Sequence, residues 1–434
     1  MSESLSFESL LARLRQASNG LPDQRTGKNT QYTIQDAVLG AFSVFYMQSP
    51  SFLAHQKHLA KARGQSNAQT LFGLHRIPSD NQIRNLLDPI DPEHLFGVFD
   101  AAYQTVAQTD LLAAFEVLDG QLLIPLDGTQ YFSSKCIHCE NCSSKTHRDG
   151  SVTYAHKVIA PVVVSPSQKD VIPLQPEFIT PQDGAKKQDS EQAAGKRWLA
   201  RNAAKFERPL TFLGDDLYCK QPFCQDVLHR GHHFIFVCKP ASHKVMYEEV
   251  ALLEKAGRVQ QVSRRHWTGT THETYTYRYV NQVALRDGAD ALEVNGCELT
   301  IQKADGRVRY KNAFATDHPI DDENVEELVQ AGRARWKVEN EHHNVLKNQG
   351  YHLAHNFGHG KHHLSAFLLT LNLLAFLFHT LLDRVDALYQ TVRQGLGART
   401  TFFNDLRALT RYLVFDSWHH LMEFMIEQGK LDSS

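Results

Sequence analysis

The spacing of apolar positions predicts helices at both ends of the chain. In residues 33–52, "TIQDAVLGAFSVFYMQSPSF", the apolar side chains recur at helical intervals behind Thr33, a suitable N-cap. The same spacing covers residues 1–115 and returns in residues 386–434, where "NDLRALTRYLVFDSWHHLMEFM" is amphipathic. We therefore expect helical regions at residues 1–115 and 386–434.

The pattern changes at about residue 116, where short apolar runs begin to alternate with helical segments. Buried strands are predicted at 122–127 ("LLIPLD"), 154–165, 171–174, 210–216 and 233–239, and helices at Asp189–Phe206 and 221–231. Buried strands interleaved with helices predict a layered α/β core in residues 116–244.

Residues 245–322 have a different texture, in which Thr, Tyr and Val alternate with polar residues, as in "TGTTHETYTYRYVNQVAL". This alternation predicts antiparallel β-structure. Helical spacing resumes over 323–385, so the β-rich segment is an insertion within the α/β unit.

The segment 364–378, "LSAFLLTLNLLAFLF", is uncharged and is the strongest candidate for a membrane span. It is shorter than the ~20 residues that a spanning helix needs. It also includes Ser365, Thr370 and Asn372. We therefore expect a helix buried in the protein core and no membrane association.

Composition narrows the classes further. The chain has 434 residues and 42% hydrophobic residues, enough for more than one structural unit, and a net charge of −2. No overall positive charge indicates nucleic-acid binding, although local basic patches remain compatible with that charge. The first residues, "MSESLSFESLLARL", lack the apolar core of a signal peptide, and seven cysteines do not suggest a disulfide framework. A cytoplasmic protein is expected.

Three of the cysteines cluster in "CIHCENC" behind the first predicted strand. His147 and His156 lie beyond this motif and are more distant candidates. Cys139 and Cys142 have the two-residue gap of a zinc site, and Cys136 and His138 are the nearest further ligands. All four lie in one loop, whereas structural zinc sites usually take their second pair of ligands from elsewhere. A structural Zn²⁺ and an unmetallated loop both fit this pattern.

Three acidic residues fall at the ends of predicted elements. Asp127 closes the first strand, Asp215 closes the fourth, and Glu339 lies on the helix that follows the β-rich insertion. Buried or half-buried carboxylates need compensation, which divalent cations provide. Two such ions ~4 Å apart can activate water and stabilise the leaving oxygen in phosphodiester cleavage. Each acidic residue also has a simpler interpretation, as a turn, a cap or a surface ion pair.

Taken together, "LLIPLDGT", "FLGDDLY" and "RWKVENEHHNVLKNQGY" resemble bacterial insertion-sequence transposases of the DDE superfamily, in the group with a β-rich insertion before the catalytic glutamate. The resemblance covers about residues 117–385. It implies an RNase H-like core that binds Mg²⁺ or Mn²⁺ through Asp127, Asp215 and Glu339. Asp216 and Glu341 are the alternative ligands.

The family's Tyr-Arg-Glu-Lys signature is incomplete in this sequence. Arg335 and Glu339 have the expected spacing, but Gly332 stands at the tyrosine position, and Lys347 is one residue late. In a regular α-helix Lys347 would lie about 80° around the axis from Glu339. The resemblance implies phosphate contacts for Arg335 and, with this offset, for Lys347. His342 and His343 lie within a turn of Glu339, where either could orient water or be structural.

Further residues are candidates for DNA contact. In the insertion, Arg264, Arg265 and Trp267 suit phosphate contacts and stacking on an unpaired base, whereas the neighbouring tyrosines fit either stacking or the sheet core. Arg84 lies on a helix with a polar face, which suits either base readout or an ordinary surface.

The resemblance implies a cut-and-paste transposase that binds double-stranded DNA at transposon ends and at the target. It further implies a homodimer on DNA, in the bacterial cytoplasm at the nucleoid. The alternatives are a former transposase that binds DNA without cleaving it, and an RNase H-like nuclease without strand transfer.

Overall fold

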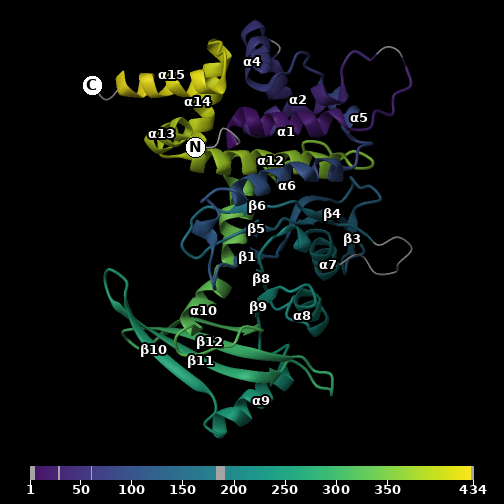
Figure 1. The fold of residues 1–434 in the computed structure, drawn as a ribbon. Coiled ribbons are helices and arrows are strands. Elements are labelled where there is room, and N and C mark those ends of the chain that lie inside the picture. The colour runs from purple at the N-terminus through teal and green to yellow at the C-terminus, as the bar shows by residue number, and fades with distance from the viewer. Residues whose placement is uncertain (1–4, 28–29, 60, 182–190, 432–434) are drawn as a thin grey trace.

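The computed structural model describes residues 5–27, 30–59, 61–181 and 191–431. The chain is a mixed α/β protein with helical regions at both ends (Figure 1). The N-terminal helices are α1 (Phe7–Asn19), α2 (Ile34–Tyr46), α3 (Phe52–Leu59), α4 (Ala62–Phe72), α5 (Asp80–Leu87) and α6 (Phe96–Ala107). Short 3-10 turns span Pro92–Leu95 and Ala113–Phe115. The predicted cap is confirmed, because Thr33 accepts a hydrogen bond from the Asp36 amide at 3.0 Å.

The C-terminal helices are α12 (Leu364–Val385), α13 (Ala387–Leu396), α14 (Arg399–Tyr412) and α15 (Trp418–Leu431). By length and composition, α12 could cross a membrane, but 89% of the residues in its most apolar stretch are buried inside the protein. In the view of Figure 1 it lies below α1 and above α6, and the centroid of its Phe378 ring is 5.2 Å from that of Phe42 on α2. The prediction of a buried core helix is confirmed.

A seven-stranded sheet forms the centre of the molecule, in the order β1-β8-β9-β13-β12-β11-β10. Strands β1 (Leu122–Pro125), β8 (Leu210–Gly214) and β9 (His233–Val237) are parallel. Strands β10 (Gln260–Trp267), β11 (His272–Ala284), β12 (Glu293–Lys303) and β13 (Val308–Thr316) are antiparallel. Because β13 pairs with β9, the β-rich insertion extends the central sheet.

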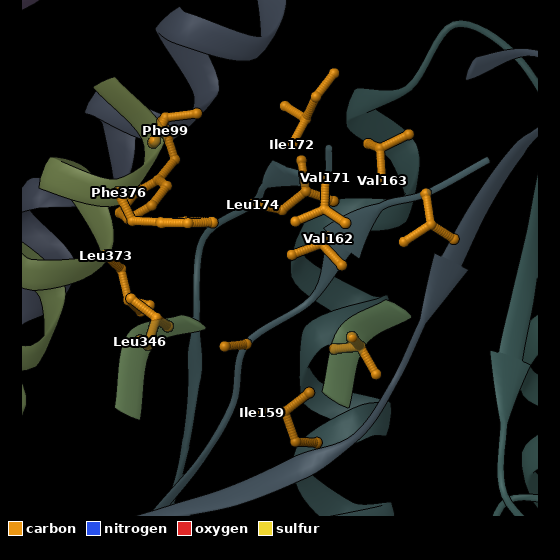
Figure 2. Close-up of a cluster of buried hydrophobic side chains, with 14 of the residues drawn as sticks. Phe99, Ile159, Val162, Val163, Val171, Ile172, Leu174, Leu346, Leu373 and Phe376 are labelled. Atoms are coloured by element: carbon orange, nitrogen blue, oxygen red, sulfur yellow. The ribbon is translucent and has the colours of Figure 1, made fainter. Parts of the chain in front are cut away.

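On the other side of β1, the hairpin β5 (Val162–Val163) and β6 (Ile172–Pro173) is joined to it through an antiparallel bridge between Leu123 and Val164. Figure 2 shows hydrophobic side chains of this hairpin gathered with Leu346, Leu373 and Phe376 from the C-terminal half of the chain. The core thus ties this hairpin to helical segments of the C-terminal half of the chain.

A separate antiparallel sheet contains β2 (Gly128–Ser134), β4 (Val152–Ile159), β3 (Ser143–Thr146) and β7 (Glu177–Ile179). The predicted strand 154–165 is therefore two strands, β4 and β5, in different sheets. The break falls at Ala160 and Pro161, where proline has no N–H for a ladder. β2, β3 and β7 were not predicted; most of β3 is exposed, so no apolar pattern marks it.

The helices between the strands are α7 (Glu191–Asn202), α8 (Gln221–Leu228), α9 (Lys244–Lys255) and α10 (Val325–Arg333). Asp189 and Ser190 of the predicted helix 189–206 lie outside the described residues. The expectation of β-structure from residue 245 is wrong at its start, because "KVMYEEVALLEK" consists mostly of good helix formers and makes α9.

After α10, the chain makes a π-helical segment, Val338–His343, and then α11 (Asn344–Asn348). The predicted helix in this region therefore contains one widened turn, and Glu339 lies on it.

Candidate active site and metal-binding groups

Asp127 and Asp215 lie side by side at the carboxyl ends of two adjacent parallel strands. In the register of β1 and β8, Pro125 is opposite Leu213, and the Leu126 amide donates to the Leu213 carbonyl at 2.8 Å. Asp127 and Asp215 each follow two residues later, just past the ends of the two strands, and the charges of both act on Glu191. The sheet therefore brings together two carboxylates that are 88 positions apart in the sequence.

Glu339 reaches the same corner through Arg335. The Arg335 guanidinium donates to Glu339 Oε1 at 2.6 Å, and the same nitrogen, Nη1, lies 3.8 Å from Asp127 Oδ1. The two carboxylate oxygens are therefore no more than about 6.4 Å apart. The expected i, i+4 relation between Arg335 and Glu339 is present as an ion pair.

The π-helical segment changes the expected position of Lys347. A π turn holds one more residue than an α turn. Each residue after a π turn is therefore rotated about the helix axis by about 100° less than it would be in an unbroken α-helix. Lys347 thereby returns to within about 20° of the Glu339 face. Its Nζ donates to Thr129 Oγ1 at 2.7 Å, two residues beyond Asp127. The expected 80° offset assumed a regular α-helix and is corrected here.

A fourth carboxylate, Glu191, lies beside the two strand ends and was not predicted. It begins α7, accepts a hydrogen bond from the Tyr218 hydroxyl at 3.0 Å, and lies against Gly128, where a Cβ atom would be 2.4 Å from Oε2. Burial raises the pKa of Glu191, and the charges of Asp127 and Asp215 raise it further. Glu191 lies in the first turn of the helix predicted over 189–206, where an acidic residue is common for helix stability alone, so its position in the sequence does not mark it as a site residue.

The two alternative ligands are placed differently from the preferred ones. Asp216 turns away into the β9–α9 connection, where it accepts from the Lys239 amide at 2.7 Å and from Ser242 Oγ at 2.6 and 2.7 Å. Among the side-chain hydrogen bonds described for Asp215, its carboxylate accepts only one, from the amide of Leu217, two residues later. Asp216 is thus a cap for a turn. No described contact ties Glu341 to Asp127.

The two histidines after Glu339 have different surroundings. His343 is buried, and its Nδ1 lies 3.4 Å from Asp127 Oδ2. His342 is buried against the Phe376 ring, with the ring centroids 5.2 Å apart, and burial lowers its pKa well below the usual range. His343 therefore belongs to the carboxylate corner, and His342 belongs to the core.

The Cys/His cluster has a different composition from the one predicted. Cys139 and Cys142 come together with His156 of β4 and with His359, whereas Cys136 is exposed and His138 stacks on Tyr154 with ring centroids 4.4 Å apart. The four converging ligand atoms all lie within 4.8 Å of one another, so this group could hold a metal ion. The loop of residues 136–142 supplies only two of these ligands, because the other two come from β4 and from the segment before α12.

Two smaller groups in the described part of the chain also bring metal-ligand atoms together. One consists of Cys219, Cys238 and His243, all buried, and the other of His233, Asp317 and His318. In the second group His233 Nδ1 lies 2.7 Å from Asp317 Oδ2, and this hydrogen bond raises the pKa of His233.

The candidate DNA-contacting residues of the insertion lie on an exposed hairpin. Trp267 ends β10, is 61% exposed, and faces the His272 ring at 4.9 Å. Arg265 is exposed, while Arg264 is bound to Glu326 at 3.1 Å. Of the tyrosines on β11, Tyr277 and Tyr279 are buried in the sheet.

Arg84 lies on α5 behind Ser79, which caps that helix. Its guanidinium is 3.7 Å from Asp80 and 6.0 Å from the centroid of the Phe52 ring. Asn81 and Asn85 on the same helix are exposed. The structure thus leaves Arg84 partly packed against the protein.

No protein-family model matches this sequence, and no curated protein matches it.

Proposed function

We propose that this protein is a DNA transposase of the DDE type, with an RNase H-like core and with Asp127, Asp215 and Glu339 as metal ligands. The observation that carries the proposal is the β1–β8 register, which sets Asp127 beside Asp215, together with the Arg335 contacts that bring Glu339 to the same corner.

The order of the strands supports the proposal. The hairpin β5–β6 lies on one side of β1, and the parallel strands β8 and β9 lie on the other, which gives the order β6-β5-β1-β8-β9. This arrangement is similar to the five-stranded core of RNase H-like enzymes. In such open sheets, sites form at the carboxyl ends of the strands, where Asp127 and Asp215 lie.

The donor set fits hard divalent cations, since carboxylate oxygens are the ligands that Mg²⁺ prefers. In a single-ion site, all ligand atoms would lie within about 4.8 Å of one another. Among the described residues, Asp127, Asp215 and Glu339 do not form such a group. A two-ion site has metals ~3.5–4 Å apart and spreads its ligands accordingly. The Arg335 guanidinium lies between Asp127 and Glu339, so these two carboxylates already stabilise a positive charge at this point.

Bound Mg²⁺ would supply activation of the attacking water or 3′-hydroxyl and stabilisation of the leaving oxygen. The chain's own residues would orient the DNA. Lys347, bonded to Thr129, and Arg335, 3.8 Å from Asp127, place positive charge near this carboxylate, where a scissile phosphate needs compensation. His343 packs behind Asp127 and orients its carboxylate.

The exposed hairpin β10–β11 is the proposed grip on DNA near the cleavage point. Its Arg265 suits a phosphate, and its Trp267 suits stacking on an unpaired base. The β-rich insertion that carries this hairpin lies at the end of the molecule opposite the N-terminal helices, for which we propose binding of the terminal repeats (Figure 1). We also propose that the protein forms a homodimer on paired DNA ends.

The test is to incubate the purified protein with the DNA that flanks its own gene, in Mg²⁺ and then in EDTA. We expect cleavage at the element ends that requires the metal, followed by joining to a plasmid target, and its loss in Asp127→Ala. Glu341→Gln is the matched control and should cleave normally. Binding without cleavage would favour a catalytically silent DNA-binding protein. Cleavage without joining would favour a nuclease.

A further inference from the structure

The group formed by Cys139, Cys142, His156 and His359 is a tetrahedron of ligand atoms. The two Sγ atoms are 3.9 Å apart, and the two Nε2 atoms are 3.1 Å apart. Three sulfur–nitrogen distances are 3.4, 3.4 and 3.5 Å, and the remaining one, between Cys139 and His359, is within 4.8 Å.

These distances can be compared with a zinc site. With Zn–S near ~2.3 Å and Zn–N near ~2.05 Å, a regular tetrahedron has edges of ~3.8 Å for S–S, ~3.6 Å for S–N and ~3.3 Å for N–N. Each of the five distances given above lies within about 0.3 Å of these edges. A disulfide does not fit, because its sulfurs would be ~2.05 Å apart.

The surroundings of the histidines match those of metal ligands. His359 Nδ1 donates to the Gly360 carbonyl at 2.9 Å, which leaves Nε2 with its lone pair directed at the cluster. The His156 ring is hydrogen-bonded to the backbone of Asn141, between the two cysteines. Zinc-bound histidines are usually fixed through the second ring nitrogen in this way. His156, His359 and Cys142 are buried, so the cluster is shielded from solvent.

We propose that these four residues form a structural Zn²⁺ site that clamps the β2–β4 sheet to the segment 352–363, which connects α11 to α12. Four protein ligands close the coordination sphere, as in structural rather than catalytic zinc sites.

The segment that the clamp holds has little secondary structure of its own. Its other attachments include Asp88, whose carboxylate accepts from the amides of Lys361 and Leu364, and Asn141, whose side chain donates to the His362 carbonyl at 2.8 Å. On one side of the segment lies α11 with Lys347, and on the other lies the buried helix α12. A metal at this point therefore fixes the end of the helix that bears the candidate catalytic residues.

The inference does not depend on the proposed function, because a chain that cleaves no DNA could still hold this ion. The experiment measures zinc in the purified full-length protein by mass spectrometry and its ligands by X-ray absorption. We expect one zinc per chain, with two sulfur scatterers near ~2.3 Å and two nitrogen scatterers near ~2.0 Å.

Four variants locate the ion. Cys142→Ser and His359→Asn should lose it, whereas Cys136→Ser and His138→Asn, in the same loop but outside the cluster, should retain it. Removing zinc from the wild-type protein should lower Tm by about 5 °C or more and increase proteolysis within 352–363, and restoring Zn²⁺ should reverse both.

Several results would overturn the proposal. These are a protein that binds no zinc when Zn²⁺ is supplied, a ligand set of nitrogen and oxygen only, and retention of zinc in soluble Cys142→Ser. Loss of zinc in Cys238→Ser with retention in Cys142→Ser would place the metal at the Cys219 group instead. If Cys142→Ser does not fold, the absorption spectrum of the wild-type protein decides the ligand set.

Discussion

At the scale of single residues, two aspartates that are adjacent in the sequence have different surroundings. Asp215 lies beside Asp127 and contributes to raising the pKa of Glu191, whereas Asp216 is bonded to Lys239 and Ser242. The sequence "GDD" offered both as ligands. The structure distinguishes them because successive residues at a strand end point in opposite directions.

Asp215→Asn and Asp216→Asn should therefore affect different properties, the first DNA cleavage and the second stability. Asp215→Asn removes a proposed metal ligand, and we expect DNA cleavage to fall by 10²-fold or more with little change in stability. Asp216→Asn weakens charge-assisted hydrogen bonds in a turn, so it should lower the free energy of unfolding by about 1–2 kcal/mol and leave cleavage intact. Cleavage assays and urea unfolding of both variants test this, and equal loss of cleavage would contradict it.

Lys347 allows a second comparison at this scale. Its ammonium bonds to Thr129 beside Asp127, so Lys347→Met should lower cleavage at least tenfold at saturating DNA. Lys347→Arg keeps the charge and should retain part of the activity. Unchanged cleavage in Lys347→Met would show that this lysine is structural.

At the scale of elements, the β10–β11 hairpin combines an exposed end with a buried base. Trp267, at the tip, is 61% exposed, whereas Tyr277, further along β11, is 1% exposed. Alternation along a strand sends successive side chains to opposite faces, but burial also depends on what covers each face. The tip of the hairpin is therefore exposed, whereas its base is part of the sheet core.

Substitutions along this hairpin should separate binding from stability. Trp267→Ala and Arg265→Ala should weaken DNA binding without lowering stability, and Arg265→Ala should reduce the salt slope of log K by about 1. Tyr277→Ala should instead lower the free energy of unfolding by about 3–5 kcal/mol. Titrations of labelled DNA at several salt concentrations, with thermal unfolding of each variant, provide the measurement. Unaltered DNA affinity in Trp267→Ala would remove the hairpin from the proposed interface.

At the scale of the whole molecule, the helical regions contain histidines that stay neutral when buried. His55 is held between Ser43 and Ser49 at 2.8 Å each, and burial lowers its pKa to about 3 from the usual 6.5. Burial likewise lowers the pKa of His379, on α12, well below its usual range. His55 links α3 to the neighbouring helix α2, whereas the His379 ring packs against Tyr46 of α2, more than 300 positions away in the sequence.

These histidines predict a loss of stability in acid. Between about pH 3 and pH 6.5 the unfolded chain binds a proton at His55 that the folded chain does not, so stability falls as pH falls. His55 should contribute about 2 kcal/mol of loss between pH 7 and pH 5. Urea unfolding at both pH values measures it. His55→Gln should reduce the loss, whereas His419→Gln, at an exposed site, should not.

Much of the architecture followed from the sequence because it depends on local patterns. The apolar periodicity predicted the terminal helical regions, the buried strands β1, β8 and β9, and α12, since burying apolar faces is the main term in folding. The acidic residues at strand ends were also visible, because a charged residue that follows a buried run marks where a strand reaches solvent.

Other features were decided only by the tertiary structure. The sequence offered His156 only as a residue beyond the cysteine cluster and did not indicate His359, because the two histidines are brought to Cys139 and Cys142 by strand pairing and by a segment about 220 residues away. The same holds for Glu191 and for the π turn that returns Lys347 to the Glu339 face. Side-chain chemistry and periodicity are local properties that the sequence determines, whereas the meeting of distant groups depends on register and packing, which exist only in the folded chain.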